Sequence, residues 1–124
     1  MKLSQLNETL SQSKLDKFED YLKDKYDLKT LFLSKSRDGI ELTSLIVNDK
    51  KQGTGTKVMQ ELIDFADKEN EMIGLSVGQK DDGHGTTSRA RLVKFYKRFG
   101  FVENKGRNKD YSMSFGMFRI PNET

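Results

Sequence analysis

The residues best suited to chemistry form a glycine turn at residues 52–56, with the sequence QGTGT. A β-prone run ends before it near Val47, and apolar residues at helical spacing begin near Gly55. The first N–H groups of a helix lack internal partners, and the helix dipole adds partial positive charge there. Glycines let the backbone approach a ligand closely, and the neighbouring lysines raise the local potential. The turn therefore predicts a site for an anion such as a diphosphate.

Spacing separates this turn from two other kinds of phosphate-binding turn. The P-loop needs a lysine directly after the second glycine of a longer loop, whereas Thr56 follows Gly55 here. The dinucleotide fingerprint needs a third glycine at position 58, where the chain has Val58. Taken alone, the turn is equally compatible with a tight strand-to-helix connection that binds no ligand.

A second segment gives the turn its context. Residues 92–101 (LVKFYKRFGF) resemble the signature of the GNAT N-acetyltransferases, in which a helix ending in an aromatic-Tyr pair runs into a Gly-Phe strand. The glycine turn resembles the pyrophosphate loop of that family, usually written Q/R-x-x-G-x-G/A, with Lys50 in the first place. Residues 104–119 resemble compact members from phages and other mobile elements. By this resemblance, residues 40–101 form an acyl-CoA-binding core.

The resemblance implies an N-acetyltransferase that moves an acetyl group from acetyl-CoA, its co-substrate, to a primary amine. The acceptor is a small molecule, a protein lysine or a protein N-terminus, and it attacks the thioester directly in a ternary complex. Tyr96 would protonate the departing CoA thiolate, and β-strand N–H groups would hold the pantetheine and the thioester oxygen. The residues expected to contact the cofactor are Ile46, Val47, Lys51, Gln52, Gly53, Thr54, Gly55, Thr56, Lys57 and Arg91.

The acceptor amine must lose a proton before it attacks, so a nearby carboxylate is useful. Glu41 lies on the strand leading into the cofactor cleft and is the candidate base, although a strand glutamate is as often simply solvated. His84, the only histidine, lies in the loop at residues 81–85, where it could border the acceptor site. The two aspartates of that loop have no further ligand cluster, so no metal site is predicted.

Helices and strands that position these residues follow from periodicity. Apolar residues at three- and four-residue spacing predict one or two amphipathic helices within residues 1–27, with Ser13 as a helix cap. Two β-prone runs separated by Asp38-Gly39 predict an antiparallel hairpin. A helix from near Gly55 and a buried strand at residues 72–77 then complete a βαβ unit.

Downstream of that unit, a second amphipathic helix is predicted to stop at Gly100, with Phe95 and Phe99 in the core. Two last strands are expected around residues 101–102 and 111–120. The predicted fold class is α/β (an α+β mixed sheet) of GNAT-like type. Its parts are N-terminal amphipathic helices, a central mixed and mostly antiparallel sheet, and the βαβ core.

Length, cysteine content and charge limit the remaining choices. The 124 residues suit one domain, residues 1–124. The absence of cysteine excludes disulfides and thiol nucleophiles. Together with a polar N-terminal segment and the lack of an apolar run of membrane-spanning length, it predicts a cytoplasmic location. If the protein is encoded by a phage, that location is the host cytoplasm. The net charge is +3, and basic residues concentrate at residues 89–109. A non-catalytic nucleic-acid-binding or inhibitory module is therefore the alternative function, and the oligomeric state is open, a homodimer included.

Overall fold

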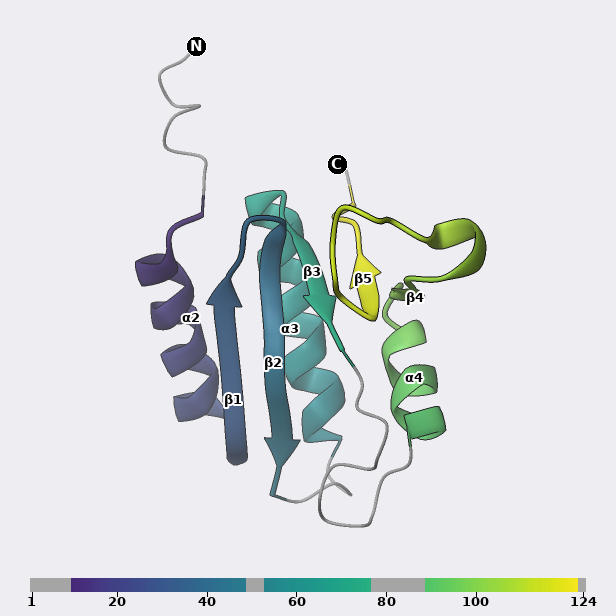
Figure 1. Ribbon diagram of the computed structural model, residues 1–124. Helices are drawn as coiled ribbons and strands as arrows, with labels where there is room; N and C mark the ends of the chain where they lie inside the picture. The colour runs from purple at the N-terminus through teal and green to yellow at the C-terminus, as the bar shows by residue number, and fades with distance from the viewer. Residues whose placement is uncertain (1–9, 49–52, 77–88, 123–124) are drawn as a thin grey trace.

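The computed structural model describes residues 10–48, 53–76 and 89–122 (Figure 1). None of the described helices is long and apolar enough to span a membrane. In chain order the elements are helix α2 (Gln12–Lys25), strands β1 (Leu28–Lys35) and β2 (Gly39–Val47), helix α3 (Thr54–Glu69), strand β3 (Met72–Leu75), helix α4 (Arg89–Lys97), strand β4 (Val102–Glu103), the 3₁₀ turn η2 (Gly106–Asn108) and strand β5 (Met117–Arg119).

The strands form a five-stranded sheet in the order β1-β2-β3-β5-β4. β2 and β3 are parallel and are joined through α3, whereas the other three pairs are antiparallel. This confirms the predicted mixed, mostly antiparallel sheet with a βαβ unit at its centre. Figure 1 shows α3 behind β2, where it covers one face of that unit.

The β1–β2 hairpin turns where Asp38-Gly39 predicted it. Gly39 has a φ of 148°, and a Cβ on it would lie 2.4 Å from the carbonyl oxygen of Met72. The Ser36 N–H donates to the Gly39 carbonyl oxygen at 2.7 Å and closes the turn. Glycine is required here because both the dihedral and the close approach of β3 exclude a side chain.

The N-cap of helix α2 lies two residues earlier than predicted. The side chain of Ser11, not that of Ser13, accepts a hydrogen bond from the Lys14 N–H at 3.1 Å. The Leu15 N–H donates to the Ser11 carbonyl oxygen at 3.1 Å, so the helix already includes Ser13, and Leu15 is fully buried one turn into it. The prediction was one or two helices within residues 1–27, and residues 1–9, where a first helix would lie, are outside the described part of the chain.

Contacts between α2 and α3 place both helices on the same face of the sheet. The rings of Phe18 and Phe65 stack with centroids 4.1 Å apart. The Glu61 carboxylate accepts hydrogen bonds from the hydroxyls of Tyr21, at 2.8 Å, and Tyr26. The main core lies between these two helices and the sheet, and Val93 and Tyr96 of α4 join it.

Helix α2 also covers part of the edge of the sheet that β1 forms. The N–H groups of Leu33 and Lys35 on edge strand β1 donate to the side chains of Glu19 and Gln12, each at 2.7 Å. Unpaired N–H groups on an edge strand attract other strands. These two side chains therefore block strand addition along this part of β1.

A second, smaller cluster packs on the other face of the sheet and contains Met72, Phe115 and Phe118. Gly74 of β3 points at it, because a Cβ on Gly74 would lie 2.1 Å from the Phe115 ring. The ring thus lies directly on the backbone of β3, where that strand pairs with β5.

Replacing Gly74 with alanine should therefore destabilise the fold by about 1 to 3 kcal/mol, the usual cost of overpacking. The measurement is urea unfolding followed by circular dichroism. Gly116→Ala is the matched control, because its nearest contact would be 3.6 Å, an ordinary van der Waals distance. Equal stability of the two variants would contradict the tight contact at Gly74.

The last strand is shorter than predicted. β4, Val102–Glu103, lies one residue from its predicted place and has the predicted length, whereas β5 has only Met117–Arg119, so the expectation of a strand over the whole of residues 111–120 was wrong. Between them the chain bends around the buried Asn104, which donates to the Phe115 carbonyl oxygen at 2.9 Å and accepts from the Asp110 N–H at 2.6 Å. A backbone held by a side chain in this way does not extend the sheet ladder.

Candidate active site

The site begins where β2 and β3 stop pairing. Their last pair is Glu41 with Gly74, after which β2 continues to Val47 while β3 ends at Leu75. Figure 1 shows β3 leaning away from β2 toward its carboxyl end. Shortly past the last pair, β2 carries a bulge at Thr43. The adjacent β1 residues Phe32 and Leu33 pair with Ser44 and Leu42, which leaves Thr43 between them without a partner in the register. Bulges bend and twist a strand, and an opening forms between the two strands.

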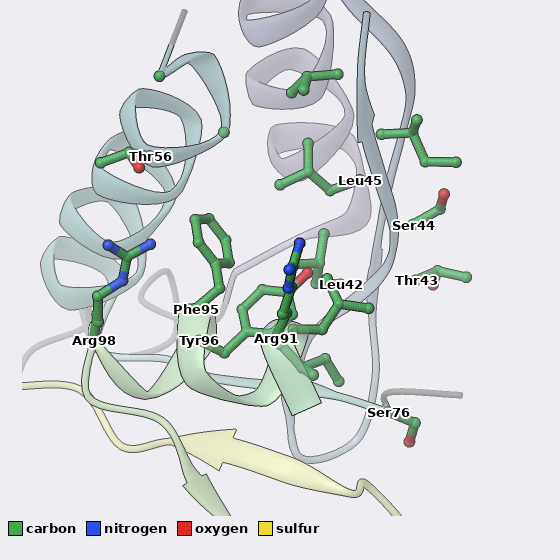
Figure 2. Close-up of a pocket in the computed structure, with 16 residues that line it drawn as sticks. Leu42, Thr43, Ser44, Leu45, Thr56, Ser76, Arg91, Phe95, Tyr96 and Arg98 are labelled. Atoms are coloured by element: carbon green, nitrogen blue, oxygen red, sulfur yellow. The ribbon is translucent and has the colours of Figure 1, made fainter. Parts of the chain in front are cut away.

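A pocket of about 530 Å³ occupies this opening (Figure 2). It is enclosed by the carboxyl half of β2, the end of β3, the start of α3 and one face of α4. Segments far apart in the chain thus meet at one point. The residues expected from the sequence that line the pocket are Ile46, Val47, Gly53, Gly55, Thr56, Arg91 and Tyr96.

The start of α3 presents backbone N–H groups at this pocket. Gly53 is its N-cap, in the left-handed conformation with φ 71° and ψ 17°, and no side chain of the described residues caps the helix there. The first intrahelical bond runs from the Lys57 N–H to the Gly53 carbonyl oxygen, at 3.2 Å. The N–H groups before it have no intrahelical acceptor. The strand before the glycine pattern and the helix after it are therefore present, and the N-terminal end of that helix lies at the pocket. Residues 49–52, which link the two, lie outside the described residues.

Gly55 faces the pocket wall formed by Phe95. A Cβ on Gly55 would lie 3.6 Å from Cζ of Phe95 and 4.0 Å from Cγ1 of Val47. Phe95 was expected only as a core residue; it is half-buried, and it also lines the pocket. Phe99, half-buried and packed edge-on to Phe95 at 5.2 Å, fits the expected core role.

Tyr96 lines the pocket from α4 and is otherwise enclosed by the core, with 9% of its surface exposed. Its ring packs edge-on against Phe95 and Phe101, at 5.2 Å and 5.7 Å between centroids. This burial raises the pKa of the Tyr96 hydroxyl to about 12, because desolvation disfavours the phenolate. At neutral pH the side chain is a protonated phenol, ready to donate.

The raised pKa of Tyr96 makes a testable contribution to stability at alkaline pH. The folded pKa of about 12 exceeds the unfolded value of about 10, so stability is complete below pH 10 and is lost as pH rises toward 12. Between pH 9 and pH 11 the free energy of unfolding of the wild-type protein should fall by about 1 kcal/mol more than that of Tyr96→Phe. Urea unfolding of both proteins at the two pH values measures this difference. Equal losses of stability in the two proteins would show that burial does not raise the pKa of Tyr96.

Arg119 of β5 holds the end of α4 against α3. It is 6% exposed, and its guanidinium donates to both Asp67 carboxylate oxygens, at 2.8 Å and 3.2 Å. Its Nε donates to the carbonyl oxygen of Phe99 at 2.9 Å. The hydrogen bonds from Arg119 lower the pKa of Asp67 below its usual range. This link fixes the chain segment that follows Tyr96.

The other expected site residues lie around the pocket or outside the described residues. Glu41 is half-buried in the last β2–β3 pair, directly before the pocket-lining Leu42. Thr54 and Lys57 lie in the first turn of α3 but do not line the pocket. Lys51, Gln52 and His84 lie outside the described residues. Residues 10–48, 53–76 and 89–122 contain no group of three or more metal-ligand side chains.

Several lining residues were missed by sequence reasoning, although two signals point to them. Phe95 and Arg98 follow Arg91 by four and seven residues, which is the spacing of one helix face. β2 continues to Val47 beyond its last pair with β3 at Glu41, so residues 42–47 border the opening. The missed lining residues are Leu42, Thr43, Ser44, Leu45, Leu75, Ser76, Leu92, Phe95 and Arg98.

The strand order, the parallel βαβ unit and the pocket at its opening define a mixed α/β protein of GNAT-like fold. The crystal structure of the anti-CRISPR protein AcrVA5 is similar, with a TM-score of 0.54 and 24% identity over 71% of this chain and 85% of that chain. Ard1 from Thermoplasma volcanium is similar with a TM-score of 0.51 and 24% identity, over 75% of this chain and 62% of that one. Both are GNAT-fold proteins. No protein-family profile and no curated protein matches the chain.

Proposed function

We propose that this chain is an N-acetyltransferase that moves an acetyl group from acetyl-CoA to a primary amine. The observation that carries the proposal is the pocket, where the uncapped start of α3 and Tyr96 meet at the point where β2 and β3 separate. A helix N-terminus suits the pyrophosphate of CoA, and a buried phenol suits the proton transfer that the reaction needs. The GNAT-like fold supports the same activity.

In this proposal the cofactor lies along the pocket. Its pyrophosphate is held by the N–H groups at the start of α3, with Gly53 and Gly55 allowing the close approach. Its pantetheine runs beside the backbone of Ile46 and Val47, which line the pocket on the side that β3 leaves open. The thioester then reaches the end of the opening nearest Tyr96.

The chemical step is a direct attack of the neutral amine on the thioester carbonyl. The C–N bond forms, the C–S bond breaks, and Tyr96 gives its proton to the departing thiolate, while the proton that the new amide nitrogen loses restores the Tyr96 phenol. A thiol with a reference pKa of about 8.5 is a stronger acid than this phenol, but burial raises the pKa of the thiol as well. The enclosed pocket therefore raises the pKa of the proton donor, Tyr96, and that of the proton acceptor, the thiolate, in the same direction, which keeps the proton transfer feasible.

Glu41 is the proposed base that takes the proton from the acceptor amine. It stands in the last β2–β3 pair, at the end of the opening where the strands still touch. A carboxylate there would act through a water or directly, depending on how far the amine enters. The acceptor itself is a small-molecule amine, a protein lysine or a protein N-terminus.

The test has a binding arm and a transfer arm. Isothermal titration calorimetry should show one acetyl-CoA bound per chain, and intact-mass spectrometry should show one acetyl group gained by an acceptor. Because AcrVA5 is an anti-CRISPR protein, the acceptor panel should include CRISPR-associated proteins beside free amines. No detectable CoA binding would overturn the proposal. Salt-sensitive binding to DNA or RNA in its place would support the nucleic-acid-binding alternative.

A further inference from the structure

A second hollow, of about 420 Å³, adjoins the pocket along α4. Arg91, Lys94, Phe95 and Arg98 line it, and all of these except Lys94 also line the first pocket. The two hollows are therefore continuous across the Phe95 ring. Figure 2 shows the guanidinium groups of Arg91 and Arg98 on either side of that ring.

Helical spacing brings these side chains together. Residues 91, 94 and 95 are three or four apart, so they share one face of α4, while Val93 and Tyr96 on another face are buried in the core. Arg98 directly follows the last residue of α4, and its N–H donates to the Lys94 carbonyl oxygen at 3.3 Å, so it continues the same face. The Arg98 guanidinium lies over the Phe95 ring, 5.4 Å from its centroid. A cation held over an aromatic ring is partly ordered before any ligand arrives. The hollow thus has an aromatic floor and a cationic rim.

We propose that this second hollow binds the adenosine 3′-phosphate end of CoA and makes the protein select CoA over 3′-dephospho-CoA. The inference rests on the proposed function, which places the pyrophosphate at the start of α3. Gly55 at that start is within van der Waals reach of Phe95, so the nucleoside that follows the pyrophosphate arrives at this ring. A phosphate monoester carries nearly two negative charges at neutral pH, and three cationic side chains surround its proposed position.

Charge complementarity favours this ligand end over the other parts of the cofactor. Pantetheine is uncharged, and the pyrophosphate already has the N–H groups of α3. The 3′-phosphate is the remaining anionic group, and ion pairs to a phosphate include charge-assisted hydrogen bonds. Because the rim is exposed, salt should weaken the selectivity.

The experiment compares the affinities of CoA and 3′-dephospho-CoA by isothermal titration calorimetry. Wild-type protein should bind CoA about tenfold more tightly at low salt. Arg98→Gln and Lys94→Gln should each lower this ratio about threefold by weakening CoA alone. Lys97→Gln, the same charge change on an exposed residue of α4 outside both hollows, should leave the ratio unchanged. Circular dichroism confirms that each variant is folded.

The outcomes separate this inference from the proposed function. Equal wild-type affinity for the two ligands would overturn the 3′-phosphate site while leaving CoA binding intact. An equal loss of affinity for both ligands in Arg98→Gln would also overturn it, because the arginine would then contact a part that the two ligands share. Binding of neither ligand would overturn the proposed function itself. Loss of DNA or RNA binding in the Arg98 and Lys94 variants, with an unchanged ligand ratio, would assign the basic rim to nucleic acid.

Discussion

Replacing Tyr96 with phenylalanine should lower kcat for acetyl transfer by about 10²-fold to 10³-fold, the range expected for loss of a general acid. The affinity for acetyl-CoA should stay within about twofold, because the variant keeps the ring that packs on Phe95 and Phe101. The missing hydroxyl removes only the proton that the departing thiolate takes. Steady-state kinetics with calorimetry on the same samples separate the two effects.

Tyr111→Phe is the matched control for this result, because Tyr111 is 88% exposed and does not line the pocket. It should transfer acetyl groups at the wild-type rate. A Tyr96→Phe enzyme as fast as this control would show that the thiolate leaves without protonation by Tyr96. The wild-type rate should also show no loss from Tyr96 ionisation up to about pH 10, since the pKa of its hydroxyl is about 12.

Replacing Gly55 with glutamate should lower the affinity for CoA more than about 100-fold. The new side chain would start toward Phe95 and Val47, into the pocket. Its carboxylate would then oppose the pyrophosphate in a partly desolvated site, where like charges repel strongly. Calorimetric titration with CoA gives the affinity.

Two variants at the same position separate charge from size. Gly55→Ala should bind CoA nearly as wild type does, because a Cβ at 3.6 Å makes an ordinary contact. Gly55→Gln has the size of glutamate without its charge, and it should bind CoA at least about tenfold more tightly than Gly55→Glu. Equal affinity of the two would contradict a pyrophosphate at this turn. Gly53 is a poorer position for the test, because its φ of 71° strains any other residue.

Much of the fold was predictable because its signals are local. Asp38-Gly39 marked the hairpin, and the glycine turn marked the start of α3 at Thr54. α4 ends at Lys97, and the turn that follows it reaches Gly100, with a φ of 94°, where the sequence predicted the helix to stop. Each of these positions needs a backbone conformation that few residues other than glycine adopt. Such a need is visible in the residue type itself.

Other predictions failed because distant residues decided them. The last strand, β5, is short because the side chain of Asn104 holds the carbonyl of Phe115 and the N–H of Asp110. The helix cap is Ser11 and not Ser13, and the first helical residue, Gln12, accepts a hydrogen bond from the Lys35 N–H of β1, a contact that favours the earlier start. In both cases two nearly equivalent local choices existed, and contacts outside the local segment separated them.

The sequence by itself determined the elements of the site: a glycine turn opening a helix, and an aromatic-Tyr pair near the end of another. Periodicity and glycine dihedrals suffice for that, since they depend on neighbouring residues only. Tertiary structure alone decided that β2 and β3 separate after Glu41 and Gly74, and that Phe95 lines the opening as well as joining the core. A pocket is the space left where four packed elements do not meet, so its walls depend on how those elements pack together.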